Sequence, residues 1–105
     1  ALGVTSAQPS ALAPGIPTVA SQGVPGYSSE AIYGLWAPAK TPRAIIARLN
    51  AETIRVLNTP EIRERFFASG VETVGTSPEA FMAAIKAEAT RLAEVIRKAG
   101  IRAKK

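Results

Sequence analysis

The sequence predicts an α/β chain that is mostly helical, with a loop-rich beginning followed by three helices. Proline and glycine occupy seven positions between Gln8 and Gly26, a density that excludes long regular structure there. Residues 33–37 read YGLWA and are largely apolar in both alternating sets, which is typical of a short strand covered on both faces. Beyond residue 42 the apolar residues recur at helical spacing, so this half of the chain is expected to be helical.

A hydroxyl residue followed by proline marks the expected start of each helix. The three pairs are Thr41-Pro42, Thr59-Pro60 and Ser77-Pro78. In each pair the hydroxyl can cap the helix, and the proline ring is preset for its first turn. The recurrence therefore predicts three helices that begin close to the three prolines.

The apolar spacing sets the expected extent of each helix. The helices are predicted over residues 42–57, from residue 60 to Ser69-Gly70, and from residue 78 to Ala99 or Gly100. The side chains expected to be buried are Ile45, Ile46, Leu49, Thr53, Val56 and Leu57 in the first helix, Ile62 and Phe66 or Phe67 in the second, and Phe81, Ile85, Ala89, Leu92, Ile96 and Ala99 in the third.

Shorter elements are expected around these helices. Residues 1–6, ALGVTS, predict a strand that ends in a polar turn, and residues 71–74, VETV, predict a brief strand or extended segment. Between them, one helical turn is expected to be capped by Thr18 and stopped by Gly23. Because a parallel or mixed sheet needs several strands, so few candidates indicate that the partner strands lie outside this chain. The chain also lacks an initiator Met, and we interpret it as a fragment.

The composition excludes several kinds of chemistry. Cysteine, histidine and aspartate are absent, and eight glutamates are the only acidic residues. These residues can build no Cys-His metal centre, thiol nucleophile or histidine-based triad. No serine or lysine is spaced to pair with a base and an orienting group, so we expect neither an enzyme nor a cofactor or metal site. The longest apolar runs are far shorter than the roughly 20 residues that cross a bilayer.

Positive charge is concentrated in the helical part of the chain. Twelve of the 13 Lys and Arg residues follow residue 40, and the sequence pI is about 10.1. Opposite charges are interleaved there, which favours solvated ion pairs over a nucleic-acid patch, at Arg48/Glu52, Glu61/Arg65, Lys86 with Glu88, and Glu94/Lys98.

A basic helical module that binds nucleic acid or another protein is the main alternative. Residues 97–105 carry five of the cations. No aromatic residues are interleaved with these charges for base stacking, and no recognised nucleic-acid motif surrounds them. We therefore expect no nucleic-acid partner.

One long ordered stretch resembles a known family. It reads GIPTVASQGVPGYSSEAIYGLWAPAKTPRAIIARLNAE and contains a Pro-Thr-x-x-x-x-Gly-x-Pro-Gly-Tyr connector and a Gly-Leu-x-Ala-Pro-x-x-Thr-Pro turn. Together with the ALGVTS strand, the Leu-Asn helix and the closing Gly-Ile, it resembles the extracytoplasmic solute receptors of tripartite tricarboxylate transporters, the Bug proteins. The chain departs from the family at residues 20–22, where an acid is usual, and at Lys40, where Gly is usual.

The resemblance implies a place for this chain in a larger fold. It would be the C-terminal third of a receptor with the two-lobe fold of periplasmic binding proteins, type II-like. Residues 1–26 would form a strand of the second lobe and a Pro/Gly-rich return connector. Residues 27–105 would form the C-terminal part of the first lobe, with short strands and three helices, and the crossing would place Tyr33 near the hinge.

The resemblance also implies a function and a site. Such receptors bind small carboxylates between their lobes, in the periplasm, and pass them to a membrane permease without covalent chemistry. Backbone N–H groups, hydroxyls and water can hold a carboxylate without arginine or metal. The candidate ligand-binding residues are Thr5 and Ser6, at the carboxyl end of the first expected strand, and Tyr33. The alternatives are that Thr5 and Ser6 hydrogen-bond their own turn and that Tyr33 is a hinge or core aromatic.

The first 40 residues also predict self-association. They are rich in apolar residues and contain only Glu30 and Lys40 as charged side chains. Strand edges without partners template pairing with another copy of the chain. We therefore expect the isolated chain to form a homo-oligomer through its N-terminal arm, defined as residues 1–40, and to bind no carboxylate tightly by itself.

Overall fold

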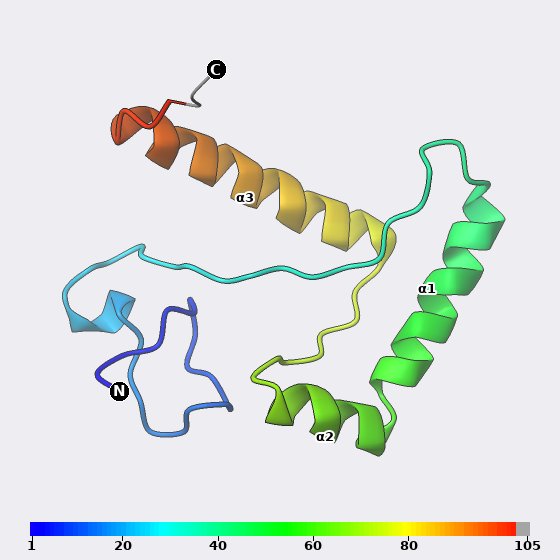
Figure 1. Ribbon diagram of the computed structural model, residues 1–105, viewed down its shortest axis with the longest axis horizontal. Coiled ribbons are helices and arrows are strands. Elements are labelled where there is room, and N and C mark those ends of the chain that lie inside the picture. The colour runs from blue at the N-terminus through cyan, green and yellow to red at the C-terminus, as the bar shows by residue number, and fades with distance from the viewer. Residues whose placement is uncertain (103–105) are drawn as a thin grey trace. The chain divides into compact units, whose positions relative to one another are not determined.

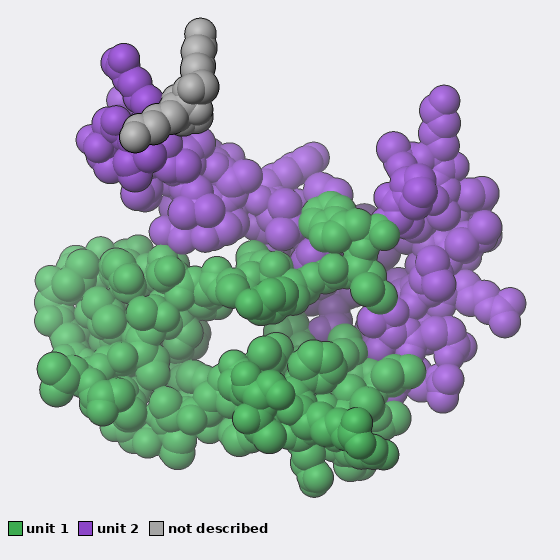
Figure 2. All heavy atoms as spheres, viewed as in Figure 1, with its two compact units in different colours: residues 1–36, 56–74 green, residues 37–55, 75–105 purple. Residues whose placement is uncertain are grey.

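The computed structural model describes residues 1–102, and within them three α-helices follow a loop-rich segment (Figure 1). The elements are η1 (Ala20–Gln22), a short 3-10 helix, and the α-helices α1 (Arg43–Leu57), α2 (Pro60–Ala68) and α3 (Pro78–Lys98). The chain divides into two compact units, Ala1–Trp36 with Val56–Val74 and Ala37–Arg55 with Gly75–Lys105 (Figure 2). The prediction of a mostly helical chain is confirmed.

The hydroxyl-proline pairs mark the helix starts, but only one hydroxyl acts as a cap. All three helices begin within one residue of the predicted prolines. At the start of α3, Ser77 Oγ accepts a hydrogen bond from the Ala80 N–H at 3.2 Å. Thr59 makes no such bond to α2, because its hydroxyl donates to the Val56 carbonyl of α1 at 2.7 Å. The predicted Thr59 side-chain cap is therefore wrong.

The start of α1 also differs from the prediction. The Pro42 carbonyl accepts the N–H groups of Ile45 and Ile46 at 3.0 and 3.2 Å, so Pro42 holds the capping position that was expected for Thr41. The backbone N–H of Thr41 donates to the Pro38 carbonyl at 3.0 Å. This bond closes a turn over residues 38–41, and the turn leads the chain into the helix.

Glycines end α2 and α3 as the sequence predicts. After α2, the N–H groups of Val71 and Gly70 donate to the carbonyls of Phe66 and Phe67, both at 2.9 Å, and Gly70 has a φ of 76°. This Schellman arrangement satisfies carbonyls that the helix leaves without partners. Gly100 closes α3 in the same way, and the last helical residue, Lys98, lies one position before the predicted end.

The single side-chain cap gives a direct test of the helix starts. Replacing Ser77 with Ala removes the acceptor for the Ala80 N–H and is expected to lower the free energy of unfolding by about 1 kcal/mol. Urea unfolding of the protein, followed by circular dichroism, measures the loss. The matched control is Thr90→Ala, which is expected to cost less than half as much because the Thr90 hydroxyl donates to the Lys86 carbonyl inside α3 and satisfies no group at a helix end. Equal losses for the two variants would contradict the assignment.

The predicted strands do not form within residues 1–102. The only β-type pairing in this part of the chain is an isolated parallel bridge between Val4 and Thr18. Residues 1–6, 33–37 and 71–74 otherwise contain no strand, so the strands predicted at 1–6 and 33–37 are wrong for this chain, while at 71–74 the alternative of an extended segment stays a prediction. A strand is stabilised by backbone hydrogen bonds to a neighbouring strand, and the sequence of one segment does not provide that neighbour.

The short turn in the connector forms as expected, although it is shorter than predicted. The helical residues are Ala20–Gln22, and the Ser21 N–H donates to Thr18 Oγ1 at 3.1 Å. Gly23 follows with a φ of 104°, a conformation that side chains rarely adopt. Thr18 thus serves both the turn and the bridge to Val4, and its side chain is only 6% exposed.

The described residues enclose no hydrophobic core. None of their apolar side chains is fully buried, and Thr18 is the one buried residue. The amphipathic helices therefore keep apolar surface that this chain does not cover.

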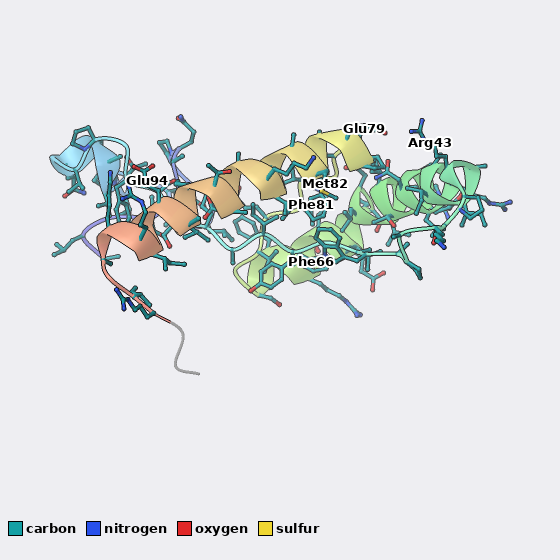
Figure 3. The ribbon with its side chains drawn as sticks, turned by 90° about the horizontal axis from the view of Figure 1, so that it is seen from above. Arg43, Phe66, Glu79, Phe81, Met82 and Glu94 are labelled. Carbon is teal, nitrogen blue, oxygen red and sulfur yellow. The ribbon has the colours of Figure 1, made fainter. Side chains whose placement is uncertain are left out.

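The predicted buried stripes are covered only in part. Half-buried members are Ile46, Thr53 and Leu57 in α1, Ile62 in α2, and Phe81 and Ile85 in α3. Phe81 is labelled on α3 in Figure 3. Exposed members are Ile45, Leu49 and Val56 in α1, Phe66 and Phe67 in α2, and Ala89, Leu92, Ile96 and Ala99 in α3. The covered side of α1 faces the segment before α3, where Asn50 Nδ2 donates to the Thr76 carbonyl at 2.9 Å.

Ion pairs line the helices, as the interleaved charges predict. They join Glu52 to Arg55 at 2.8 Å, Glu61 to Arg65 at 3.1 Å, Glu94 to Lys98 at 2.7 Å, and Glu88 to Arg91. Two predicted partners change, because Glu52 pairs with Arg55 and not Arg48, and Glu88 pairs with Arg91 and not Lys86.

Hydrogen bonds from Arg91 hold the pKa of the Glu88 carboxyl below its ordinary value. Lys104 and Lys105 of the basic C-terminal run lie outside the described residues.

Candidate functional site

The candidate site lies where the chain leaves its single β-bridge. The Val4 N–H donates to the Pro17 carbonyl, and the Val19 N–H donates to the Val4 carbonyl, both at 2.9 Å. The next residue, Thr5, accepts the Ser29 N–H on its carbonyl at 2.8 Å. Val4 and Thr5 are therefore bonded to two separate parts of the chain, residues 17–19 and residue 29.

Ser6 and Thr5 occupy different environments in this loop. Ser6 is half-buried, and its hydroxyl donates to the Gln8 carbonyl at 2.7 Å. The alternative that Ser6 hydrogen-bonds its own turn is thus confirmed, although its oxygen keeps lone pairs that can accept a further bond. Thr5 is exposed, and the contact that holds it is made by its backbone carbonyl.

A third residue of the loop binds a carboxylate group of the chain itself. The Ala7 N–H donates to Glu30 Oε1 at 2.7 Å, across 23 residues of sequence. Sequence reasoning missed this role for Glu30. The signal was its isolation, since Glu30 is the only acidic residue in the first 40 positions.

Tyr33 is not brought to the loop by any hydrogen bond among the described residues. Its side chain is 77% exposed, and every residue from 31 to 40 is exposed. The alternative that Tyr33 is a core aromatic is therefore wrong for this chain. Thr5 and Ser6 are adjacent by sequence, but the structure does not join Tyr33 to them, and its role as a ligand-binding residue stays a prediction.

Residues 5–8 of the loop offer hydrogen-bonding groups and no charged side chain. Its donors and acceptors are the hydroxyls of Thr5 and Ser6 and the backbone of residues 5–8. Within residues 1–102, no three His, Cys, Asp or Glu side chains gather to hold a metal ion. None of the helices in the same range has the length and apolar character needed to cross a membrane. Hydroxyl and backbone groups of this kind can form hydrogen bonds with a small polar ligand.

Comparison with known proteins identifies the family. Residues 1–101 match the family described as "Tripartite tricarboxylate transporter family receptor". The chain belongs to this family of receptors, and the resemblance noted from the connector and turn motifs is confirmed. It is a family of solute-binding receptors and not a family of enzymes.

Individual relatives agree with this assignment. The chain is 36% identical over 97 residues to the "UPF0065 protein in tcbD-tcbE intergenic region" of Pseudomonas sp. (strain P51), covering 91% of this chain and 29% of that protein. It is 37% identical over 90 residues to the "UPF0065 protein in the TAR-I ttuE-ttuC' intergenic region" of Agrobacterium vitis, covering 83% and 26%. It is 31% identical over 104 residues to "Protein BugT" of Bordetella pertussis (strain Tohama I), covering 99% and 32%.

The chain matches only part of the length of each relative. It spans between 26% and 32% of the length of these three relatives. No solved structure matches it. Family membership thus rests on nearly the whole of this chain, while most of each relative has no counterpart in it.

Proposed function

We propose that this chain is part of a periplasmic receptor that captures a small carboxylate and delivers it to a membrane permease. Membership of the tripartite tricarboxylate transporter receptor family supports the class of function. The observation that carries the site is the Ala7 N–H, which binds the Glu30 carboxylate at 2.7 Å without help from a cation. A loop whose backbone N–H donates to one carboxylate is chemically suited to bind another carboxylate.

The proposed receptor has two lobes of the periplasmic binding-protein type. Residues 1–26 would supply a strand of the second lobe and the return connector, and residues 27–105 the C-terminal part of the first lobe. The exposed apolar faces of α1 and α3 support this arrangement, because they need cover from elements outside the chain. Sheet partners for residues 1–6 and 33–37 would come from the same elements.

In the proposed site, Thr5 and Ser6 would present hydroxyls to the ligand and Tyr33 would form part of the cleft wall. Neutral hydroxyl and backbone groups, completed by water, can hold a carboxylate without an arginine. No nucleic-acid partner is proposed. The four ion pairs on the helices support this, because they occupy cations that a phosphate backbone would otherwise contact.

Calorimetry on the full-length receptor tests the proposal. The probes are citrate, malate, glutamate and aspartate, and we expect at least one to bind. In that complex Thr5→Ala and Ser6→Ala are each expected to weaken binding by about two- to tenfold, the usual effect of one lost hydrogen bond. Thr90→Ala is the matched control and should leave binding unchanged, because the Thr90 hydroxyl donates to the Lys86 carbonyl within α3. A receptor that binds none of the four probes would overturn the proposed function.

A further inference from the structure

Two consecutive residues, Ser29 and Glu30, hold the loop that carries the candidate site. The Ser29 N–H donates to the Thr5 carbonyl at 2.8 Å, and Glu30 Oε1 accepts the Ala7 N–H at 2.7 Å. Ser6, the residue between these two contacts, is therefore fixed from both sides. The loop has no helix or strand of its own, so these bonds and the Ser6–Gln8 contact determine its conformation.

The Glu30 contact differs from the ion pairs on the helices and, like the bond between Ser10 and Glu72, joins segments that are far apart in sequence. The four ion pairs of the described residues join glutamates to cations three or four positions away on the same helix. Glu30 instead reaches a backbone N–H that is 23 residues distant. Hydrogen bonds from N–H groups to an ionised acceptor are shorter and stronger than neutral ones, and the 2.7 Å separation of Ala7 N and Glu30 Oε1 lies in that range.

We propose that Glu30 is a positioning residue for the ligand-binding loop, acting through its hydrogen bond to the Ala7 N–H. The proposal rests on the proposed function, because it assigns Glu30 a role in that same site. Glu30 itself does not contact the ligand. Its carboxylate oxygen fixes the backbone at Ala7, which sets the direction of the Thr5 and Ser6 hydroxyls before the ligand arrives. Sites whose supporting contacts are lost bind less tightly, because the ligand must then order the loop.

The length of the side chain, more than its charge, is what the proposal requires. Glu30→Gln keeps an oxygen acceptor at the same reach but loses the charge. Glu30→Asp keeps the charge but is one methylene shorter, so it withdraws the acceptor from the Ala7 N–H. The two variants therefore separate hydrogen bonding from electrostatics, and both are mild enough to preserve folding.

The experiment uses the full-length receptor and two readouts. Calorimetry measures affinity for whichever of citrate, malate, glutamate and aspartate binds the unchanged receptor, and amide hydrogen exchange reports on Ala7. Glu30→Ala and Glu30→Asp are expected to weaken binding by about fivefold and to speed exchange at Ala7, as befits the loss of one charge-assisted hydrogen bond. Glu30→Gln should restore binding to within about twofold of the unchanged receptor. Glu64→Ala removes the same charge from exposed α2 and should change neither readout.

The outcomes distinguish this inference from the proposed function. If the receptor binds none of the probes, the proposed function fails, and the exchange rate of Ala7 still decides whether Glu30 fixes the loop. If the receptor binds a probe and Glu30→Asp binds it equally well or more tightly, the positioning role fails while the function stands. Weakening by Glu30→Gln as large as that by Glu30→Ala would also overturn it, because binding would then require the charge of Glu30 and not only an oxygen acceptor at the same reach.

Discussion

The isolated 105-residue chain is expected to bind citrate, malate, glutamate and aspartate no more tightly than the millimolar range. The chain presents one loop of the proposed site, with the hydroxyls of Thr5 and Ser6, while Tyr33 is 77% exposed and is not hydrogen-bonded to that loop. Two or three hydrogen bonds contribute about 0.5–1.5 kcal/mol each. A dissociation constant of 1 μM requires about 8.2 kcal/mol, which these groups cannot supply without a second wall around the ligand.

Calorimetry on the isolated chain checks this expectation, with the full-length receptor as its control. The comparison is sharp because the same loop residues are present in both proteins. Heat that corresponds to sub-micromolar binding by the isolated chain would show that the site is complete within these residues. The proposed two-lobe cleft would then be wrong.

The helices were predictable because their signals are local. Proline positions and left-handed glycines act within one turn of the helix end, so Pro60, Pro78 and Gly70 mark the boundaries correctly. Whether a hydroxyl side chain caps the helix that follows it was not predictable from the same local signals. Thr59 and Ser77 look alike in sequence, but the end of α1 lies beside Thr59 and takes its hydroxyl.

The strands and the burial were not predictable from the same kind of signal. A pattern such as YGLWA gives the character of a strand but does not provide its neighbour, and residues 33–37 remain without a ladder. In α1 the apolar stripe is wider than the surface available to cover it, so Ile46 is half-buried while Leu49 is exposed. Burial depends on contacts distant in sequence, and the spacing of apolar residues records only which sides of a helix are suited to it.

Only the part of the candidate site that has a local sequence signal was predictable. Thr5 and Ser6 follow from the rule that ligands bind beyond the carboxyl ends of strands, although only a bridge at Val4 represents that strand here. Glu30 did not follow from any local pattern, because its partner, Ala7, lies 23 residues away. Its isolation as the one charged residue among the first 39 was the available clue.

The isolated chain is expected to sediment as a dimer or larger assembly at micromolar concentration. Large apolar side chains are exposed along its N-terminal arm, at Leu2, Val24, Tyr27, Ile32, Tyr33, Leu35 and Trp36. Burial of about 600 Å² of apolar surface per chain would contribute about 15 kcal/mol, at about 25 cal/mol per Å². This matches or exceeds the roughly 4–15 kcal/mol that association costs in lost translational and rotational freedom.

Exchange of the N-terminal arm between two copies is the form of association that we favour. Residues 1–36 and 56–74 belong to one compact unit, within which Ser10 Oγ donates to the Glu72 carboxylate. An exchanged arm would make the same contact with the second copy, so no new interface chemistry is needed. Residues 41 and 42 would serve as the hinge, because they lie between the arm and α1 and are not helical.

Two matched variants decide whether the arm drives this association. Leu35 and Val74 are both 80% exposed, but only Leu35 lies in the N-terminal arm. Leu35→Lys places a charge in the surface that is expected to be buried, and it should shift the sedimentation equilibrium toward the monomer by at least about tenfold. Val74→Lys adds the same charge outside the arm and should leave the assembly intact.

A single species at 11.0 kDa that is unchanged by dilution would mean that the arm folds back on its own chain. Equal dissociation by both variants would instead trace the assembly to net charge, since a lysine at either position raises it by the same amount.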